Sequence, residues 1–265
     1  MKKLKIATLS ILLLSTAAFI IFSIYDLITH DGKPPVIKCS EEITVSVEAD
    51  EEELLKGVTA KDDKSGDVSD SLVVEKISDF IEDNTRIVTY AAIDEKGNVG
   101  RKECALHYTD YQSPQIFLNS PLRFDVNKIP EIKKSLDANS VLDGNIGNKV
   151  KYSISDEQIL QGIGIVPIEL SVTDSAGKKT EISTILELYD KNEESIEIEL
   201  SNYLVYIKQG SEFYSREYIQ EISREGRLSI ESNVDVNVPG VYQVDYTVED
   251  RGSVGKTRLI VVVEE

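Results

Sequence analysis

The hydrophobic pattern of the chain changes character after its first 25 residues. Residues 6–25 carry no charged side chain and are mostly apolar. Beyond them, apolar and polar residues alternate in short stretches, most regularly over 84–94, 164–174 and 240–250. An uncharged run of this length forms a helix that crosses the ~30 Å hydrocarbon layer of a membrane. Alternation with a period of two is typical of a β-strand with one buried face. The pattern therefore predicts one apolar helix followed by an all-β body.

The apolar run at 6–25 has two interpretations. Three lysines precede it, and lysines flanking a span hold that side in the cytoplasm. On this interpretation residues 1–33 form a cytoplasmic tip, a single-pass membrane anchor and a spacer. Alternatively, the small residues at 15–17 form the cleavage site of a signal peptide. The run is longer than the usual apolar core of a signal peptide, about 7–15 residues, which favours the anchor. Both interpretations place the body outside the cytoplasm.

The body repeats one unit three times. Each alternating stretch ends on an aspartate, followed by a glycine-containing turn and a second strand. This is the pattern of a β-hairpin, and many short strands in units of this size favour small immunoglobulin-like β-sandwiches. The linkers lack the Gly or Pro runs of flexible connections, which indicates a fairly stiff tandem. The three predicted modules are 34–110, 112–190 and 193–265.

The composition excludes several kinds of chemistry. The chain has no tryptophan, two cysteines and two histidines, His30 and His107. These are too few for a histidine-rich metal site or a cysteine-based zinc site, and any Ser-His-Asp triad would need one of the two histidines. A net charge of −18 disfavours nucleic acid as a partner. Composition thus predicts an acidic globular protein that is not an enzyme.

The first unit carries a motif that resembles a known family. Residues 58–69 read Val-x-Ala-x-Asp and then Gly-Asp-Val-Ser, and residues 90–98 read Tyr-x-x-x-Asp-x-x-Gly-Asn. This pattern resembles the bacterial immunoglobulin-like, hyalin-repeat-like surface domains of exported Gram-positive proteins. The second unit matches loosely, and the third keeps only its strand and Asp250. The resemblance implies an immunoglobulin-like fold and export more than any activity.

The resemblance also bears on the two cysteines. Cys39 falls on the opening strand of the first unit and Cys104 on its closing strand. In immunoglobulin-like sandwiches these strands commonly run side by side, and outside the cytoplasm a disulfide persists. The resemblance therefore implies a Cys39–Cys104 disulfide. The alternative is a pair of buried free thiols that pack as small hydrophobes.

Two groups of aspartates are candidate sites. The first gathers in one acidic turn and consists of Asp62, Asp63, Asp67 and Asp70. Clustered carboxylates on a loop suit Ca²⁺, the only cofactor that the sequence suggests, but aspartate is also a common, well-solvated turn residue. The second group, Asp94, Asp174 and Asp250, recurs at one position of the repeat. We expect these three to fix the following turn by accepting backbone N–H groups.

The sequence thus predicts a non-catalytic, membrane-anchored extracellular stalk or interaction protein at a bacterial cell surface. Its expected partners are the membrane, through residues 6–25, and an unidentified protein or glycan. One alternative is an adhesin or glycan-binding module with a specific ligand. The other is an accessory component of an envelope enzyme or assembly complex. No catalytic residue is predicted.

Overall fold

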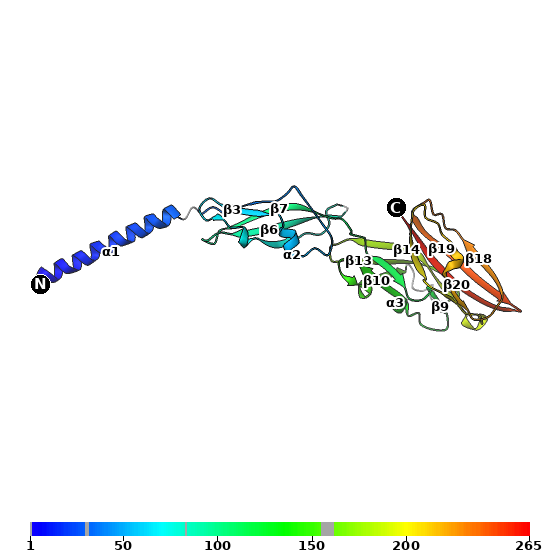
Figure 1. The fold of residues 1–265 in the computed structure, drawn as a ribbon. Coiled ribbons are helices and arrows are strands. Elements are labelled where there is room, and N and C mark those ends of the chain that lie inside the picture. The colour runs from blue at the N-terminus through cyan, green and yellow to red at the C-terminus, as the bar shows by residue number, and fades with distance from the viewer. Residues whose placement is uncertain (1, 30–31, 83, 155–161) are drawn as a thin grey trace. The chain divides into compact units, whose positions relative to one another are not determined.

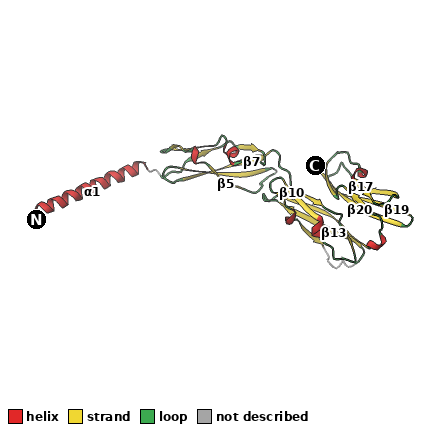
Figure 2. Ribbon diagram, turned by 60° about the horizontal axis from the view of Figure 1, so that its bottom comes forward, coloured by secondary structure: helices red, strands yellow, loops and turns green. Residues whose placement is uncertain are grey.

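A computed structural model shows one long helix and a body built mainly of β-strands (Figure 1; Figure 2). The structure describes residues 2–29, 32–82, 84–154 and 162–265. The chain divides into two compact units, Met1–Asp110 and Tyr111–Glu265, called unit 1 and unit 2 below. Within the described residues the strands form three pairs of sheets. The predicted fold class, immunoglobulin-like β-sandwiches behind an N-terminal apolar helix, is confirmed.

Helix α1 spans Lys2–Thr29 and extends past both ends of the predicted apolar run. Its segment Thr8–Asp26 has a mean hydropathy of 2.1, and the side chains of this segment are exposed. The hydroxyls of Ser15 and Thr16 each donate to a carbonyl three residues earlier, at 2.9 Å. Their polar groups are therefore satisfied inside the helix, as a membrane requires. A helix of this length and composition fits a membrane span, and signal sequences share these features.

Unit 1 contains one sandwich of two sheets. The small sheet has the order β1-β3-β4 and the large sheet the order β2-β7-β6-β5. The small sheet consists of β1 (Val36–Lys38), β3 (Thr59–Asp62) and β4 (Gly66–Asp67). The large sheet consists of β2 (Glu42–Val45), β5 (Val73–Ile77), β6 (Thr85–Ile93) and β7 (Val99–Tyr108). The chain thus opens in the small sheet and crosses to the large one, where β2 runs parallel to the last strand, β7.

The core of unit 1 is built from the inward positions of the alternating stretch. Val88 and Tyr90 on β6 and Leu106 on β7 are completely buried. The short helix α2 (Glu51–Leu55) closes the core between β2 and β3. The hydroxyl of Tyr90 donates to the carbonyl of Leu54 on α2, at 2.6 Å. A tyrosine can therefore occupy this position because its one polar group has a partner.

A disulfide joins Cys39 and Cys104 in unit 1. Cys39 directly follows β1, where the chain leaves the small sheet, and is half-buried. Cys104 lies on β7 and is buried. Their Cα atoms are 6.7 Å apart, within the usual range for a disulfide. The bond ties the crossing segment to the last strand of the large sheet.

Unit 2 contains two further sandwiches on the same plan. The second sandwich has a small sheet of β8 (Gln115–Leu118), β10 (Leu136–Ser140) and β11 (Gly144–Asn145). Its large sheet has the order β12-β13-β14-β9, with β9 (Arg123–Asp125), β12 (Lys151–Ile154), β13 (Gly164–Thr173) and β14 (Lys179–Tyr189). A short helix, α3 (Ile132–Ser135), precedes β10.

The third sandwich has a small sheet of only two strands, β15 (Ile198–Leu200) and β17 (Ile219–Ile222). Its large sheet has the order β16-β20-β19-β18 and consists of β16 (Leu204–Lys208), β18 (Arg227–Ser232), β19 (Gly240–Asp250) and β20 (Ser253–Glu264). As in the other two sandwiches, the second strand lies parallel to the last one, here β20.

The second and third sandwiches share a hydrophobic face. Leu259 and Val261 on β20 belong to the core of the third sandwich. Their neighbour Ile260 and Leu204 on β16 belong instead to the core cluster of the second sandwich. The large sheet of the third sandwich is therefore buried on both sides at β16 and β20. The run of five apolar residues at 259–263 follows from this, because a strand covered on both faces has no polar side.

Tyr206 on β16 adds a polar contact to the shared face. Its hydroxyl accepts a hydrogen bond from the backbone N–H of Ile116 at 2.9 Å and donates to the carbonyl of the same residue at 3.2 Å. Ile116 lies on β8 of the second sandwich. Burial raises the pKa of Tyr206 to about 12, so the hydroxyl stays protonated and can make both bonds.

The disulfide predicts a stability difference between the two units. The bond closes a separation of 65 residues in unit 1, and unit 2 contains no cysteine. Loop entropy gives such a bond about 4 kcal/mol. Reduction of the full chain is therefore expected to lower the unfolding free energy of unit 1 by up to about 4 kcal/mol. Amide hydrogen exchange resolved by peptide measures both units at once. Equal loss of protection in unit 2, or none in unit 1, would contradict the assigned role of the bond.

Candidate binding surface

The acidic turn of unit 1 has structural contacts of its own. Oδ1 of Asp62 accepts from the backbone N–H groups of Lys64 and Ser65, at 2.9 and 2.6 Å. Oδ1 of Asp67 accepts from the backbone and the hydroxyl of Ser69. The hydrogen bonds from Ser65 and Lys64 hold the pKa of Asp62 below its usual value.

The other two carboxylates of this turn are not drawn into one site with Asp62 and Asp67. Asp63 pairs with Lys33 at 3.1 Å, with both side chains exposed, and Asp70 lies in a 3₁₀ turn at Ser69–Ser71. Among the described residues, no group of three or more acidic, histidine or cysteine side chains is arranged to hold a metal ion. The geometry therefore gives Asp62 and Asp67 a structural role in the turn.

The recurring aspartates act on their turns in two of the three sandwiches. Oδ1 of Asp94 accepts from the backbone N–H groups of Lys96 and Asn98, each at 2.8 Å, and Oδ2 accepts from the side-chain amide of Asn98. Burial raises the pKa of Asp94, but the hydrogen bonds from Asn98 and the backbone outweigh it, so that the pKa lies below its usual value. Asp174 accepts from Ala176 and Lys178 in the same way.

Each sandwich completes the arrangement differently. In the second sandwich, Oδ2 of Asp174 accepts from the hydroxyl of Tyr111 at 2.6 Å, and both residues are buried. The third sandwich turns in two residues, Arg251 and Gly252, which both have positive φ. This is the backbone of a tight hairpin that needs no side-chain bridge. Asp250 there is half-buried and contacts the guanidinium of Arg251 at 3.9 Å.

A buried ionic cluster lies where the second and third sandwiches meet. Its centre is Arg123 on β9, whose side chain is only 5% exposed. Arg123 Nε donates to Glu187 at 3.0 Å and Nη2 donates to Glu194 at 2.7 Å. Nη1 donates to the backbone carbonyl of Lys256 on β20, and the guanidinium lies 4.4 Å from the ring centre of Tyr189. We call these residues the interdomain cluster.

Every side of the Arg123 guanidinium is used in the interdomain cluster. Burial lowers the pKa of Arg123, but hydrogen bonds to Glu194 and Glu187 outweigh this effect, so that the net shift is upward. Burial raises the pKa of Glu187, but Arg123 and then Arg258 outweigh it and hold that pKa below its usual value. Arg258 on β20 lies 3.7 Å from Glu187 and donates to Asp245 at 2.6 Å. The charges are thus paired across two sandwiches.

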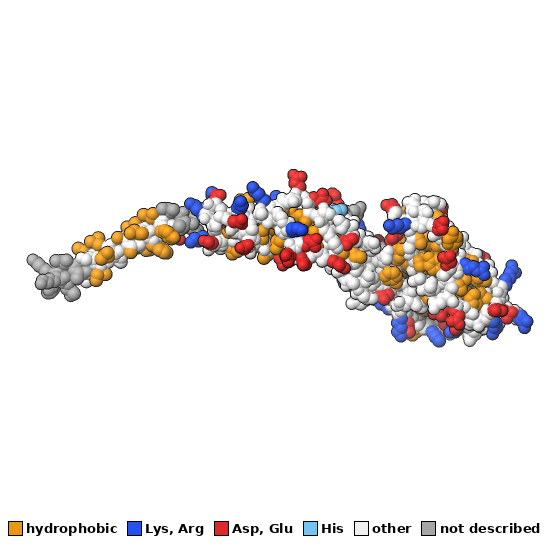
Figure 3. All heavy atoms as spheres, in the orientation of Figure 1, with side chains coloured by type: hydrophobic (Ala, Val, Ile, Leu, Met, Phe, Trp, Pro, Cys, Tyr) orange, Lys and Arg blue, Asp and Glu red, His pale blue; other side chains and the backbone are white. Residues whose placement is uncertain are grey.

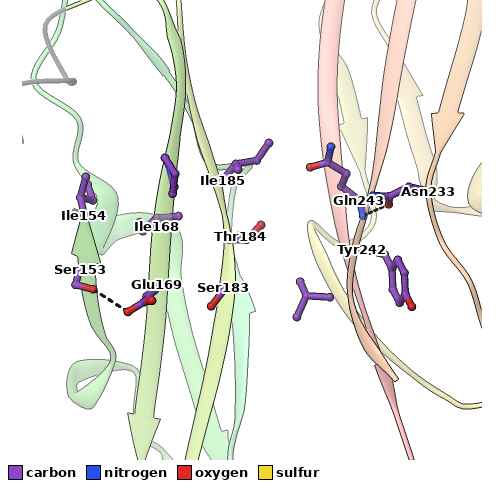
Figure 4. A pocket seen from close by; sticks show the side chains of 12 residues that line it. Ser153, Ile154, Ile168, Glu169, Ser183, Thr184, Ile185, Asn233, Tyr242 and Gln243 are labelled. Atoms are coloured by element: carbon purple, nitrogen blue, oxygen red, sulfur yellow. Dashed lines mark hydrogen bonds between the residues drawn. The ribbon is translucent and has the colours of Figure 1, made fainter. Parts of the chain in front are cut away.

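A groove of about 670 Å³ also runs between these sandwiches (Figure 4). One wall is the outer face of β13 and β14, with Pro167, Ser183 and Ile185. The facing wall is β19, with Val241 and Gln243. Among the described residues that line the groove, Glu169 is the one that carries a charge, although the protein is strongly acidic. Figure 3 shows hydrophobic side chains gathered on the visible face of this unit near β14 and β19. The groove suits a ligand that is uncharged and both apolar and hydrogen-bonding.

The residues singled out from the sequence do not line this groove. The two cysteines and the acidic turn belong to unit 1, and Asp174 and Asp250 sit in hairpin turns. A signal for the groove was nevertheless present. Pro167 and Ile185 are apolar residues at the outward positions of alternating strands, where polar residues are usual.

Comparison with known proteins identifies no family for this chain. No protein-family model and no curated protein matches it. Among solved structures, the chain is similar to the M60 catalytic domain of ZmpB from Clostridium perfringens with its CBM51 domains. The two are 12% identical with a TM-score of 0.26, and the match covers 86% of this chain and 42% of that one. The extracellular domain of protocadherin GammaB4 is 12% identical with a TM-score of 0.21, and the match covers 89% of this chain and 50% of that one. The chain therefore spans half the length of these two structures or less.

A third structure, the protocadherin gammaB7 cis-dimer, is 11% identical with a TM-score of 0.22. The match covers 87% of this chain and 74% of that one. All three likenesses are distant.

The interdomain cluster predicts how acid affects unit 2. The pKa of Glu187 is lower in the folded chain than its usual value of 4.5, so folding favours the ionised form. The stabilisation is fully present above pH 4.5 and is lost as the pH falls through the lower, folded value. Urea unfolding of the full chain between pH 7 and pH 3, followed by circular dichroism, measures this loss.

The variant Glu187→Gln separates this effect from general acid sensitivity. It is expected to lower stability at pH 7 by about 3 kcal/mol, because Arg123 loses a buried partner, and to flatten the acid dependence. The matched control is Glu181→Gln on the same strand, whose side chain is 66% exposed. If both variants show the same pH profile as the unaltered chain, Glu187 does not carry the effect.

Proposed function

We propose that this protein is a non-catalytic, membrane-anchored interaction protein on the extracellular side of a bacterial envelope. On this proposal α1 is an uncleaved anchor with its N-terminus in the cytoplasm. The immunoglobulin-like sandwiches, of the hyalin-repeat-like type that the motif in the first unit suggests, form the extracellular body.

One observation carries the proposal: an exposed apolar helix precedes a disulfide-closed sandwich. The side chains of Thr8–Asp26 are exposed and apolar, an arrangement that water disfavours and a bilayer favours. The Cys39–Cys104 bond supports export, because disulfides persist outside the reducing cytoplasm. The lysines before the helix support the cytoplasmic placement of the N-terminus.

Protease treatment of intact protoplasts tests the proposed topology. We expect added protease to digest both units while a fragment containing α1 stays protected by the membrane. A cytoplasmic protein of the same cells, which must remain intact until lysis, is the control. Digestion of the body only after lysis would refute export. Recovery of the body at full-length mass in the membrane pellet distinguishes an anchor from a cleaved signal peptide.

The groove supports a second candidate, a module that binds a specific neutral ligand such as a glycan. Its lining combines aliphatic side chains with uncharged hydrogen-bonding groups, which suits a neutral ligand that has both apolar faces and hydroxyl groups. Binding of a panel of neutral oligosaccharides to the full chain is expected to be lost in Ile185→Asp. The matched control is Ile165→Asp, an exposed isoleucine on the adjacent strand outside the groove. Equal binding to Ile185→Asp and the unaltered chain would remove this candidate.

A further inference from the structure

Strand β18 is a free edge of the large sheet in the third sandwich (Figure 1). Within the described residues it pairs with β19 alone, whereas the strand at the opposite edge, β16, packs against the second sandwich. It runs over six residues, Arg227–Ser232, and its register with β19 is continuous. An edge strand presents unpaired backbone groups that can pair with another chain.

The equivalent edge strands of the other two sandwiches are irregular or shorter. The register of β5 in the first sandwich shifts between Val74 and Lys76, and β12 in the second sandwich has four residues. Bulges and short lengths are devices by which sheets prevent pairing between edges. Strand β18 has neither feature and contains no proline, so it is the best suited of the three to accept a further strand.

The backbone groups that point outward from β18 are those of its even-numbered residues. The backbone N–H of Asn233, directly after β18, donates to the carbonyl of Gln243 next to β19, at 3.3 Å. Hydrogen-bonded and non-hydrogen-bonded positions alternate along an antiparallel ladder. The odd-numbered residues of β18 therefore bond to β19, and the N–H and C=O groups of Leu228 and Ile230 face the free edge. A further antiparallel strand must pair with these two residues.

The side chains of β18 differ between its two faces. Leu228 and Ile230 are partly buried and pack against the core of the third sandwich. Arg227, Ser229 and Glu231 are exposed on the other face. Neither charged side chain of β18 forms an ion pair with any residue that the structure describes. Glu231 moreover lies opposite Asp245 on β19, and like charges in that position are unfavourable.

The sequence of β18 is complementary to itself in the antiparallel orientation. A two-fold axis at Ser229 places Arg227 opposite Glu231 of a second copy, and Glu231 opposite Arg227 of that copy. The same register places Leu228 opposite Ile230 of the second copy, and these are the residues whose backbone groups face outward. Moving the axis to Leu228 or Ile230 loses both charge pairs. Opposite charges and apolar residues in directly facing positions stabilise a strand pair.

We propose that β18 pairs with β18 of a second copy of this chain and joins the two large sheets into one. The Leu228–Ile230 pairs each exchange two backbone hydrogen bonds, and the two-fold symmetry makes the contact self-complementary. The proposal goes beyond the proposed interaction function, because it adds a second copy as a partner. Anchoring in one membrane would raise the effective concentration of the two copies, but the pairing itself does not require it.

Cysteine cross-linking of the full chain in detergent micelles tests the pairing and its register. Both native cysteines are joined in a disulfide, so each variant carries one free thiol. Ser229→Cys places two thiols at the axis, in a non-hydrogen-bonded pair with Cα atoms about 4.5 Å apart. The matched control is Ser232→Cys, an exposed serine of the same strand. Its two copies lie about 20 Å apart in this register. We expect mild oxidation to cross-link Ser229→Cys about tenfold faster than the control.

Charge reversal tests the same register through different side chains. Added to Ser229→Cys, Arg227→Glu places like charges opposite each other at both ends of the pairing and should slow cross-linking about tenfold. Adding Glu231→Arg as well restores opposite charges, and fast cross-linking should return. This recovery cannot come from restored stability at position 227, because Arg227→Glu still faces Glu249 within its own sheet. Circular dichroism verifies that every variant is folded.

Three results would overturn the proposal. Equal cross-linking of Ser229→Cys and Ser232→Cys would show random collision or association through α1. Failure of Ser229→Cys to cross-link would show that the edges do not meet. Slow cross-linking of the folded double reversal would show that Arg227 and Glu231 do not face each other. None of these results depends on membrane topology, which the protoplast experiment tests separately.

Discussion

The double burial of β20 is the constraint on which the organisation of unit 2 depends. One side of this strand fills the core of the third sandwich, and the other side, at Ile260, packs into the core of the second. Tyr206 and the interdomain cluster add directional bonds around this apolar contact. Hydrophobic contact alone permits sliding, whereas hydrogen bonds and ion pairs fix a register. The groove has walls in both sandwiches, so its shape depends on that register.

The interdomain cluster stabilises this arrangement because Arg123 at its centre is fully paired. A buried guanidinium without partners is highly unfavourable, and removing one partner from a buried pair costs about 3–5 kcal/mol. Arg123 has two carboxylates, a backbone carbonyl and an aromatic ring around it.

Much of the fold could be predicted because it rests on local alternation. The stretches that contain Val88, Val166 and Val244 carry apolar residues at alternate positions, with Arg86 as the exception, and each forms a central strand of its sheet. The short-range roles of Asp94 and Asp174 were also predictable, since each carboxylate bonds to the turn that follows it. The tight turn after Asp250 was not, because its two-residue loop uses positive φ in place of an aspartate bridge.

The candidate sites escaped sequence reasoning because they join residues far apart in the chain. Arg123, Glu187 and Lys256 look like ordinary charged strand residues until the fold brings them together. The apolar run at 259–263 was the one local sign of a second buried face, and it did not indicate what would cover that face.

The central claim is that the second and third sandwiches behave as one body. Amide hydrogen exchange of the full chain at increasing urea concentrations tests it most directly, because it reports the unfolding free energy of each strand separately. The shared face predicts that the slowest amides of β13, in the second sandwich, and of β19, in the third, exchange with the same free energy and the same urea dependence. Separate free energies with separate, smaller urea dependences would mean that the two sandwiches unfold independently and would contradict the account.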